Sequence, residues 1–152
     1  MSGKPASRSP QKNQRRRSRE IALQALYAWT LAGGNPLEHA RTLEGWDRCD
    51  QDLCDRLIRD VTARREALEE RIAPHSSRAL ASLSPVERVI LLIGTVELEA
   101  MLETPFRVVI NEAIELGKSF GGTDGHKFVN GVLEKLAAEL RAPEIARARA
   151  SA

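Results

Sequence analysis

The stretch SPVERVILLIGTVEL (84–98) decides the fold class of this 152-residue chain. Ser84 suits the N-cap of a helix, Pro85 suits its first position, and Glu87 is spaced to close a capping box with Ser84. The apolar residues that follow would face every side of a helix, which predicts a central and buried one. Gly94 inside it costs about 1 kcal/mol against alanine. A close crossing by another helix would explain that cost.

Helical periodicity extends to both sides of this stretch, and no segment has the alternating pattern of a strand. Aromatic residues make up only 4% of the chain, so its core must be mostly aliphatic, which suits packed helices. The sequence predicts an all-α fold, a single domain of six to seven helices. The expected helices are a first from about 16–18 to 32, a second over 36–43 capped by Asn35, a third over 51–72, a short turn or helix in 75–83, the central one from 84 to about 102, one beginning at Thr104–Pro105, and a last one capped by Thr123 or Asp124 and ending near Leu140.

The chain is expected to have three parts. Residues 1–14 are rich in Ser, Pro, Lys, Arg and Gln, which predicts a disordered basic arm. Residues 15–141 are expected to form the helical domain, and residues 142–152 a polar C-terminal tail. No apolar run approaches the ~20 residues of a membrane span. Cys49 and Cys54 lie on an expected helix, and as free thiols they fit a cytoplasmic location.

Several kinds of catalytic and cofactor site lack their sequence signal. The histidines, His39, His75 and His126, have no partner at metal-ligand spacing, so we expect no metal and no cofactor. Gly117-Lys118-Ser119 resembles the end of a phosphate-binding loop, but the required earlier glycine is replaced by Glu112. Because no serine or cysteine stands in a nucleophile motif either, we expect no catalytic residue and no enzyme.

The charge is distributed unevenly. Residues 1–19 carry seven basic residues and no acidic one, whereas residues 20–152 carry 16 basic against 21 acidic residues. Arg15, Arg16 and Arg17 fall at the expected start of the first helix, where cations oppose the helix dipole. A polyanion such as RNA would relieve that cost and gain from counterion release. The alternative is a solubilising tail.

The segment from Lys118 to Asn130 is a second candidate for nucleic-acid binding. Its glycines surround an expected helix N-terminus, where free N–H groups can meet phosphate. Lys118 and Lys127 add positive charge, and Phe120 and Phe128 offer rings for stacking unpaired bases. The alternative is a glycine turn that carries two core phenylalanines.

Four segments together resemble the NusB family of antitermination factors: RRRSREIALQALYAWT (15–30), VERVILLIGTVEL (86–98), VINEAIELGKSFGG (109–122) and HKFVNGVLEKLA (126–137). The resemblance implies an all-α fold of two packed helical subdomains. It also implies binding to BoxA, a short single-stranded RNA element of ribosomal operons, together with the small-subunit ribosomal protein NusE. The pair would assemble with RNA polymerase in the antitermination complex.

The resemblance also implies roles for individual residues. By motif position, the RNA-facing residues are Arg15, Arg16, Arg17, Lys118, Asp124, Lys127 and Phe128. Tyr27 and Glu87 fall where the family meets its protein partner. Glu87 has the alternative role of helix cap, and Tyr27 that of a half-buried packing residue.

Two other functions are compatible with the same helices. NusB-like domains also form the N-terminal part of a ribosomal RNA cytosine-5 methyltransferase, but this chain ends about ten residues past its last expected helix, so we expect that interpretation to fail. The other is a helical protein-interaction module without RNA. The implied fold is compatible with a monomer or with a homodimer that hides the RNA surface.

Overall fold

The computed structural model describes residues 10–122 and 124–151, and within these ranges the chain forms seven α-helices, three short 3-10 helices and no strand. The expected all-α fold is therefore confirmed. The chain divides into two compact units, the first ending at Ile58 and the second beginning at Arg59. The boundary falls inside one helix, α3 (Gln51–Ile72). Among the described residues, no helix is both long enough and apolar enough to cross a bilayer.

The first unit is built on α1 (Pro10–Ala32), which packs against α2 (Pro36–Thr42) and a 3-10 helix at Trp46–Arg48. Asn35 caps α2 as expected, because its Oδ1 accepts hydrogen bonds from the backbone N–H groups of residues 37 and 38. The buried face of α1 supplies aliphatic side chains to the core of this unit.

Helix α1 begins at Pro10, earlier than the expected start at 16–18. Contacts with Asp50 stabilise these first turns: its backbone N–H donates to the Gln14 carbonyl at 3.3 Å, and its own carbonyl accepts from Ser18 Oγ at 2.6 Å. Sequence periodicity carries no information about such a contact. Residues 10–14 of the expected arm are thus helical, while residues 1–9 lie outside the described part of the chain.

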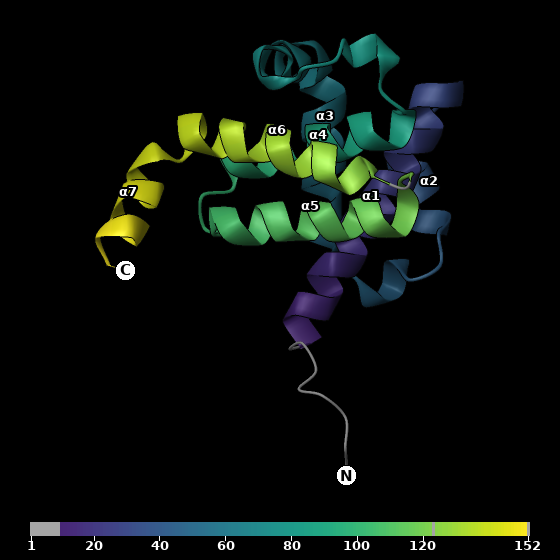
Figure 1. Ribbon diagram of the computed structural model, residues 1–152. Coiled ribbons are helices and arrows are strands. Elements are labelled where there is room, and N and C mark those ends of the chain that lie inside the picture. Colours follow the sequence, from purple (N-terminus) through teal and green to yellow (C-terminus); the bar gives the residue numbers. More distant parts are fainter. Residues whose placement is uncertain (1–9, 123, 152) are drawn as a thin grey trace. The chain divides into compact units, whose positions relative to one another are not determined.

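In the second unit, α4 (Pro85–Ala100), α5 (Phe106–Phe120) and α6 (Gly125–Leu140) pack against one another (Figure 1). Ser84 caps α4, its Oγ accepting from the Glu87 N–H at 3.1 Å. Every residue from 89 to 98 is buried, as the sequence predicted for a central helix. A Cβ on Gly94 would lie 3.0 Å from both terminal carbons of Leu133 on α6. The close helix crossing expected at Gly94 is confirmed.

The chain between α3 and α4 contains 3-10 helices at Ala73–His75 and Leu80–Ser82. A seventh helix, α7 (Ala142–Ala150), follows α6, where the sequence had predicted a polar tail after the last helix (Figure 1). Pro143 lies in the first turn of α7, where proline is tolerated, so helix resumes directly after α6.

Arg141 links three helices at the junction of α6 and α7. Only 3% of it is exposed, and its guanidinium donates to the carbonyls of Glu97 and Met101 at 3.0 Å and of Leu98 at 2.7 Å, at the C-terminal end of α4. A cation is favoured at this end of a helix dipole. Glu144, which accepts a bond from Arg141, also accepts from the Phe106 N–H at the start of α5, at 2.9 Å. Burial alone would raise the pKa of Glu144, but these hydrogen bonds bring it below its ordinary value.

Replacing Arg141 with alanine should lower the free energy of unfolding by about 3 kcal/mol, because three buried carbonyls lose a charged donor. Chemical denaturation would measure the loss. Arg147→Ala is the matched control, since it removes the same charge from an exposed position on α7. An equal loss in both variants would contradict the assignment of Arg141 as a helix cap.

Candidate nucleic-acid interface

The turn between α5 and α6 gathers four of the residues expected to face RNA. Lys118 lies in the last turn of α5, Asp124 at the N-cap position of α6, and Lys127 and Phe128 in the first turn of α6. Asp124 and Lys127 form an ion pair at 3.3 Å with both side chains more than 70% exposed. Because such an exposed pair contributes little to stability, Lys127 can exchange Asp124 for a phosphate at small cost.

Phe128 is half-buried. This exposure is intermediate between the two alternatives, a core residue and a free stacking surface. The guanidinium carbon of Arg78 lies over its ring, 4.2 Å from the ring centroid. This is the distance range of a cation–π contact. One face of the Phe128 ring is therefore already occupied. Arg78, in the chain between α3 and α4, is a residue that the sequence analysis did not single out.

Glu87 belongs to the same cluster, although the resemblance placed it on the protein-partner side. Its Oε1 accepts a hydrogen bond from Arg78 Nη2 at 2.9 Å. Its Oε2 lies so close to Gly125 that a Cβ there would come within 2.7 Å of it. Half of the expected capping box is present, in the Ser84 bond, while the Glu87 carboxylate itself pairs with Arg78. The pair with Arg78 thus gives the Glu87 carboxylate a role within the chain, whereas the cap uses only its backbone N–H.

The N-terminus of α6 differs from the phosphate site that the sequence suggested. Asp124 occupies its N-cap position, and the Glu87 carboxylate lies beside Gly125, the first residue of the helix. Within residues 124–151 the Asp124 side chain makes no capping hydrogen bond, while Thr123, the other candidate cap, lies outside the described residues. Both carboxylates lie near this helix N-terminus and carry charge of the same sign as a phosphate, so they disfavour one there.

The three expected RNA-binding arginines of the first unit lie on α1 and are half-buried. Arg17 donates from Nη1 to the carbonyl of Arg48 at 3.2 Å, and its stem lies against Gly45, where a Cβ would be 2.8 Å from Arg17 Cδ. Arg17 therefore supports the 45–48 loop. Arg15 and Arg16 also interact with other groups of the chain. Of the three arginines, these two remain as candidates for contacts with RNA.

Tyr27 lies on the surface of α1, with 37% of its area exposed, and Leu31 one turn later is 60% exposed. Residues four apart on a helix share a face, so these two form an exposed apolar pair. Tyr27 thus reaches the surface with most of its area covered, which is compatible with both alternatives, an interface residue and a half-buried packing residue. An exposed tyrosine beside an exposed leucine is typical of the centre of a protein–protein interface.

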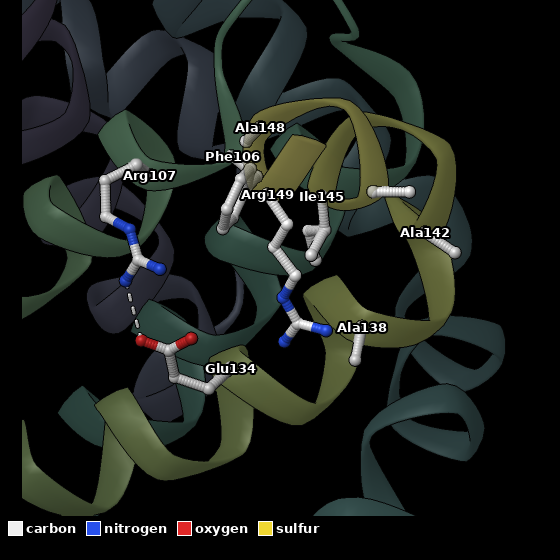
Figure 2. A pocket seen from close by; sticks show the side chains of 9 residues that line it. Phe106, Arg107, Glu134, Ala138, Ala142, Ile145, Ala148 and Arg149 are labelled. Atoms are coloured by element: carbon white, nitrogen blue, oxygen red, sulfur yellow. Dashed lines mark hydrogen bonds and ion pairs between the residues drawn. The ribbon is translucent and has the colours of Figure 1, made fainter. Parts of the chain in front are cut away.

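A separate hollow of about 440 Å³ lies between the start of α5, the end of α6 and α7 (Figure 2). It is lined mainly by alanines, with Phe106 and Ile145, and Arg107 at its edge points toward Glu134. The hollow lies at the opposite end of α5 from Lys118 and contains none of the predicted site residues.

Comparison with known proteins assigns the family. The family model described as the NusB family matches residues 16–138. The chain belongs to the NusB family. The Transcription antitermination protein NusB of Aromatoleum aromaticum is 51% identical over 138 residues, which cover 89% of this chain and 95% of the relative. The protein of the same name from Burkholderia mallei is 49% identical over 136 residues, which cover 88% of this chain and 94% of that one.

Solved structures agree with this assignment. T. maritima NusB superimposes with a TM-score of 0.77 at 27% identity, covering 86% of this chain and 95% of that one. A structure of antitermination factors NusB and NusE in complex with dsRNA matches with a TM-score of 0.70 at 27% identity, covering 84% of this chain and 98% of that one. The all-α architecture is thus that of other NusB-family proteins.

Arg17→Ala should lower the free energy of unfolding by about 1 kcal/mol, because the 45–48 loop loses a hydrogen bond and the packed stem. Denaturant titration would measure this. Arg48→Ala is the matched control: it removes an equal charge from the same contact but leaves the accepting carbonyl in place. If Arg17→Ala were as stable as wild type, the loop-supporting role would be wrong.

Proposed function

We propose that this chain is a transcription antitermination factor that binds single-stranded BoxA RNA of ribosomal operons together with the ribosomal protein NusE, and that the pair assembles with RNA polymerase. The observation that carries the proposal is membership of the NusB family over most of the chain. Its structural relative, a NusB, has been solved with NusE and RNA.

The surface proposed for RNA is the turn between α5 and α6, which offers exposed Lys118 and Lys127 beside Phe128. Among the described residues, both lysines pair with acids of their own helix or turn that are at least partly exposed, Glu115 at 3.6 Å and Asp124 at 3.3 Å. Such pairs are weak in water, so a phosphate chain can compete for the lysines. In the first unit, Arg15 and Arg16 are the proposed RNA contacts.

The surface proposed for the NusE-like partner is the exposed face of α1 with Tyr27 and Leu31. Glu87 is a weaker candidate for that surface, because its carboxylate already binds Arg78. We place the RNA-binding domain in residues 15–141, between a basic arm (1–14) and a polar C-terminal segment (142–152). Sedimentation analysis of the free protein distinguishes a monomer from a homodimer that covers the RNA surface.

We propose no catalytic activity and a cytoplasmic location. Burial raises the pKa of the Cys54 thiol to about 12, and burial also raises that of Cys49, so neither is a reactive thiolate at neutral pH. A protein-interaction module without RNA is the alternative in another class. RNA binding separates it from the proposed function.

The chain should bind BoxA-type single-stranded RNA more tightly than a duplex of equal length, because stacking requires unpaired bases. Its affinity should fall with salt with a log–log slope of about −2 to −4, as roughly three to five phosphates are neutralised. Fluorescence anisotropy over a salt series would measure both, with a scrambled strand of equal composition as control. Tighter duplex binding would contradict the single-strand preference, and absence of any RNA binding would favour the interaction module.

The two proposed surfaces should be separable by mutation. Phe128→Leu keeps apolar volume but removes the ring on which the Arg78 guanidinium lies, and should weaken RNA binding about tenfold, while NusE binding is unchanged. Tyr27→Ala should do the reverse. Direct titrations with RNA and with the purified partner would measure the effects, alongside thermal melts. If either variant lost both ligands while remaining folded, the assignment of distinct surfaces would be wrong.

A further inference from the structure

We propose that Arg78 forms the outer layer of a base-stacking platform, in which an unpaired RNA base stacks on the Arg78 guanidinium, which in turn lies on the Phe128 ring. Glu87 is the positioning residue that holds the guanidinium in place. This inference rests on the proposed RNA-binding function and identifies where one base of that RNA binds.

The first step concerns access to Phe128. The Arg78 guanidinium carbon lies 4.2 Å from the centroid of the Phe128 ring, so a base cannot reach that face of the ring while Arg78 stays in place. The ring is itself half-buried in the second unit. The Arg78 side chain, however, is 48% exposed. The stacking surface that solvent reaches at this point is therefore the guanidinium plane.

The second step is that Arg78 is held before any ligand arrives. Ser76 Oγ bonds to both backbone groups of Arg78, donating to its carbonyl at 2.6 Å and accepting from its N–H at 3.2 Å. Glu87 Oε1 accepts from Arg78 Nη2 at 2.9 Å. Glu87 is in turn fixed, because its N–H is bonded to Ser84 and its Oε2 packs against Gly125. The guanidinium is thus held by Glu87 and the Phe128 ring on an anchored backbone, so it loses little entropy when a base stacks on it.

The third step distinguishes a base from a phosphate. The charge of Arg78 is matched by Glu87, and Asp124 also stands at this end of α6. A phosphate placed here would meet these carboxylates, so charge gives Arg78 little advantage. Its planar face remains available, and guanidinium planes are established stacking surfaces for unpaired RNA bases. Lys118 and Lys127, with their weak and exposed pairs, are better placed to neutralise the RNA backbone.

The molecule contains a matched control. Arg107 lies over the Phe106 ring at 4.9 Å and pairs with Glu134 at 2.8 Å, so it repeats the arginine, phenylalanine and glutamate arrangement of Arg78. It lies at the start of α5, at the opposite end of that helix from Lys118. Figure 2 shows Arg107 with Phe106 and Glu134. Substitutions at Arg107 therefore report the effect of disturbing such a cluster away from the proposed RNA surface.

The experiment compares Arg78→Lys and Arg78→Ala in titrations with BoxA-type single-stranded RNA. Lysine keeps the charge but has no planar face, so both variants should bind about tenfold more weakly than wild type. Arg78→Lys should keep the wild-type salt slope, since the number of neutralised phosphates is unchanged. Arg107→Lys and Arg107→Ala should bind RNA as wild type does. Circular dichroism confirms that each variant is folded at the temperature used.

A second measurement locates the base. RNAs with one abasic nucleotide at each position in turn should reveal a position at which wild type loses affinity and Arg78→Lys loses none further. In Glu87→Gln, the loss of affinity caused by an abasic nucleotide should be smaller than in wild type at that same position and at no other. If Arg78 had a purely structural role, Arg78→Lys would bind RNA more weakly, but the loss of affinity at each abasic position would be the same as in wild type.

Wild-type affinity in Arg78→Lys would overturn the inference in favour of a simple charge contact, and wild-type affinity in both Arg78 variants would remove Arg78 from the interface. An equal loss in the Arg107 variants, or an unchanged abasic profile in Arg78→Lys, would overturn it as well. If wild type itself bound no RNA, the proposed function would fail, and this result is distinct from all of the others.

Discussion

Helix α4 is apolar around its whole circumference, and burying it constrains the rest of the second unit. Residues 89–98 are covered on all sides, and the approach of α6 is close enough at Gly94 that a methyl group there would collide with Leu133. Because α5 and α6 both pack on α4, the turn that joins them falls at the end of the unit where α4 begins. Gly125, the first residue of α6, therefore comes to lie against Glu87, and Phe128 against Arg78, the partner of Glu87.

Two arginines of the second unit show how exposure separates a structural from a functional role. Arg141 is buried, its donors are used by three carbonyls of the chain, and it fixes the C-terminal end of α4. Arg78 also pairs with a glutamate and has an aromatic neighbour, but half of its side chain remains in solvent. A ligand could not reach Arg141 without unfolding the junction of α6 and α7. Arg78, in contrast, is both held in place and accessible.

Local signals in the sequence were enough for most of the fold. Asn35 and Ser84 cap helices as their side-chain chemistry predicts, and the apolar run of α4 and the close crossing at Gly94 could both be derived from residue type and spacing. The errors came from contacts between distant residues. The first turns of α1 are held by Asp50, and the junction from which α7 continues is held by contacts of Arg141 with α4 and of Glu144 with the start of α5.

The candidate site was predictable only in part, for the same reason. Spacing and resemblance found Lys118, Lys127 and Phe128 because they are neighbours in one short segment. Arg78 was missed because Phe128 lies on another helix and Glu87 nine residues away, and an arginine in a polar loop carries no local signal. The same contacts change the roles assigned to two predicted residues. Phe128 supports the Arg78 guanidinium instead of offering a bare stacking face, and the Glu87 carboxylate is already bound to Arg78 in the absence of a protein partner. Packing thus decides which part of a correctly predicted segment a ligand can touch.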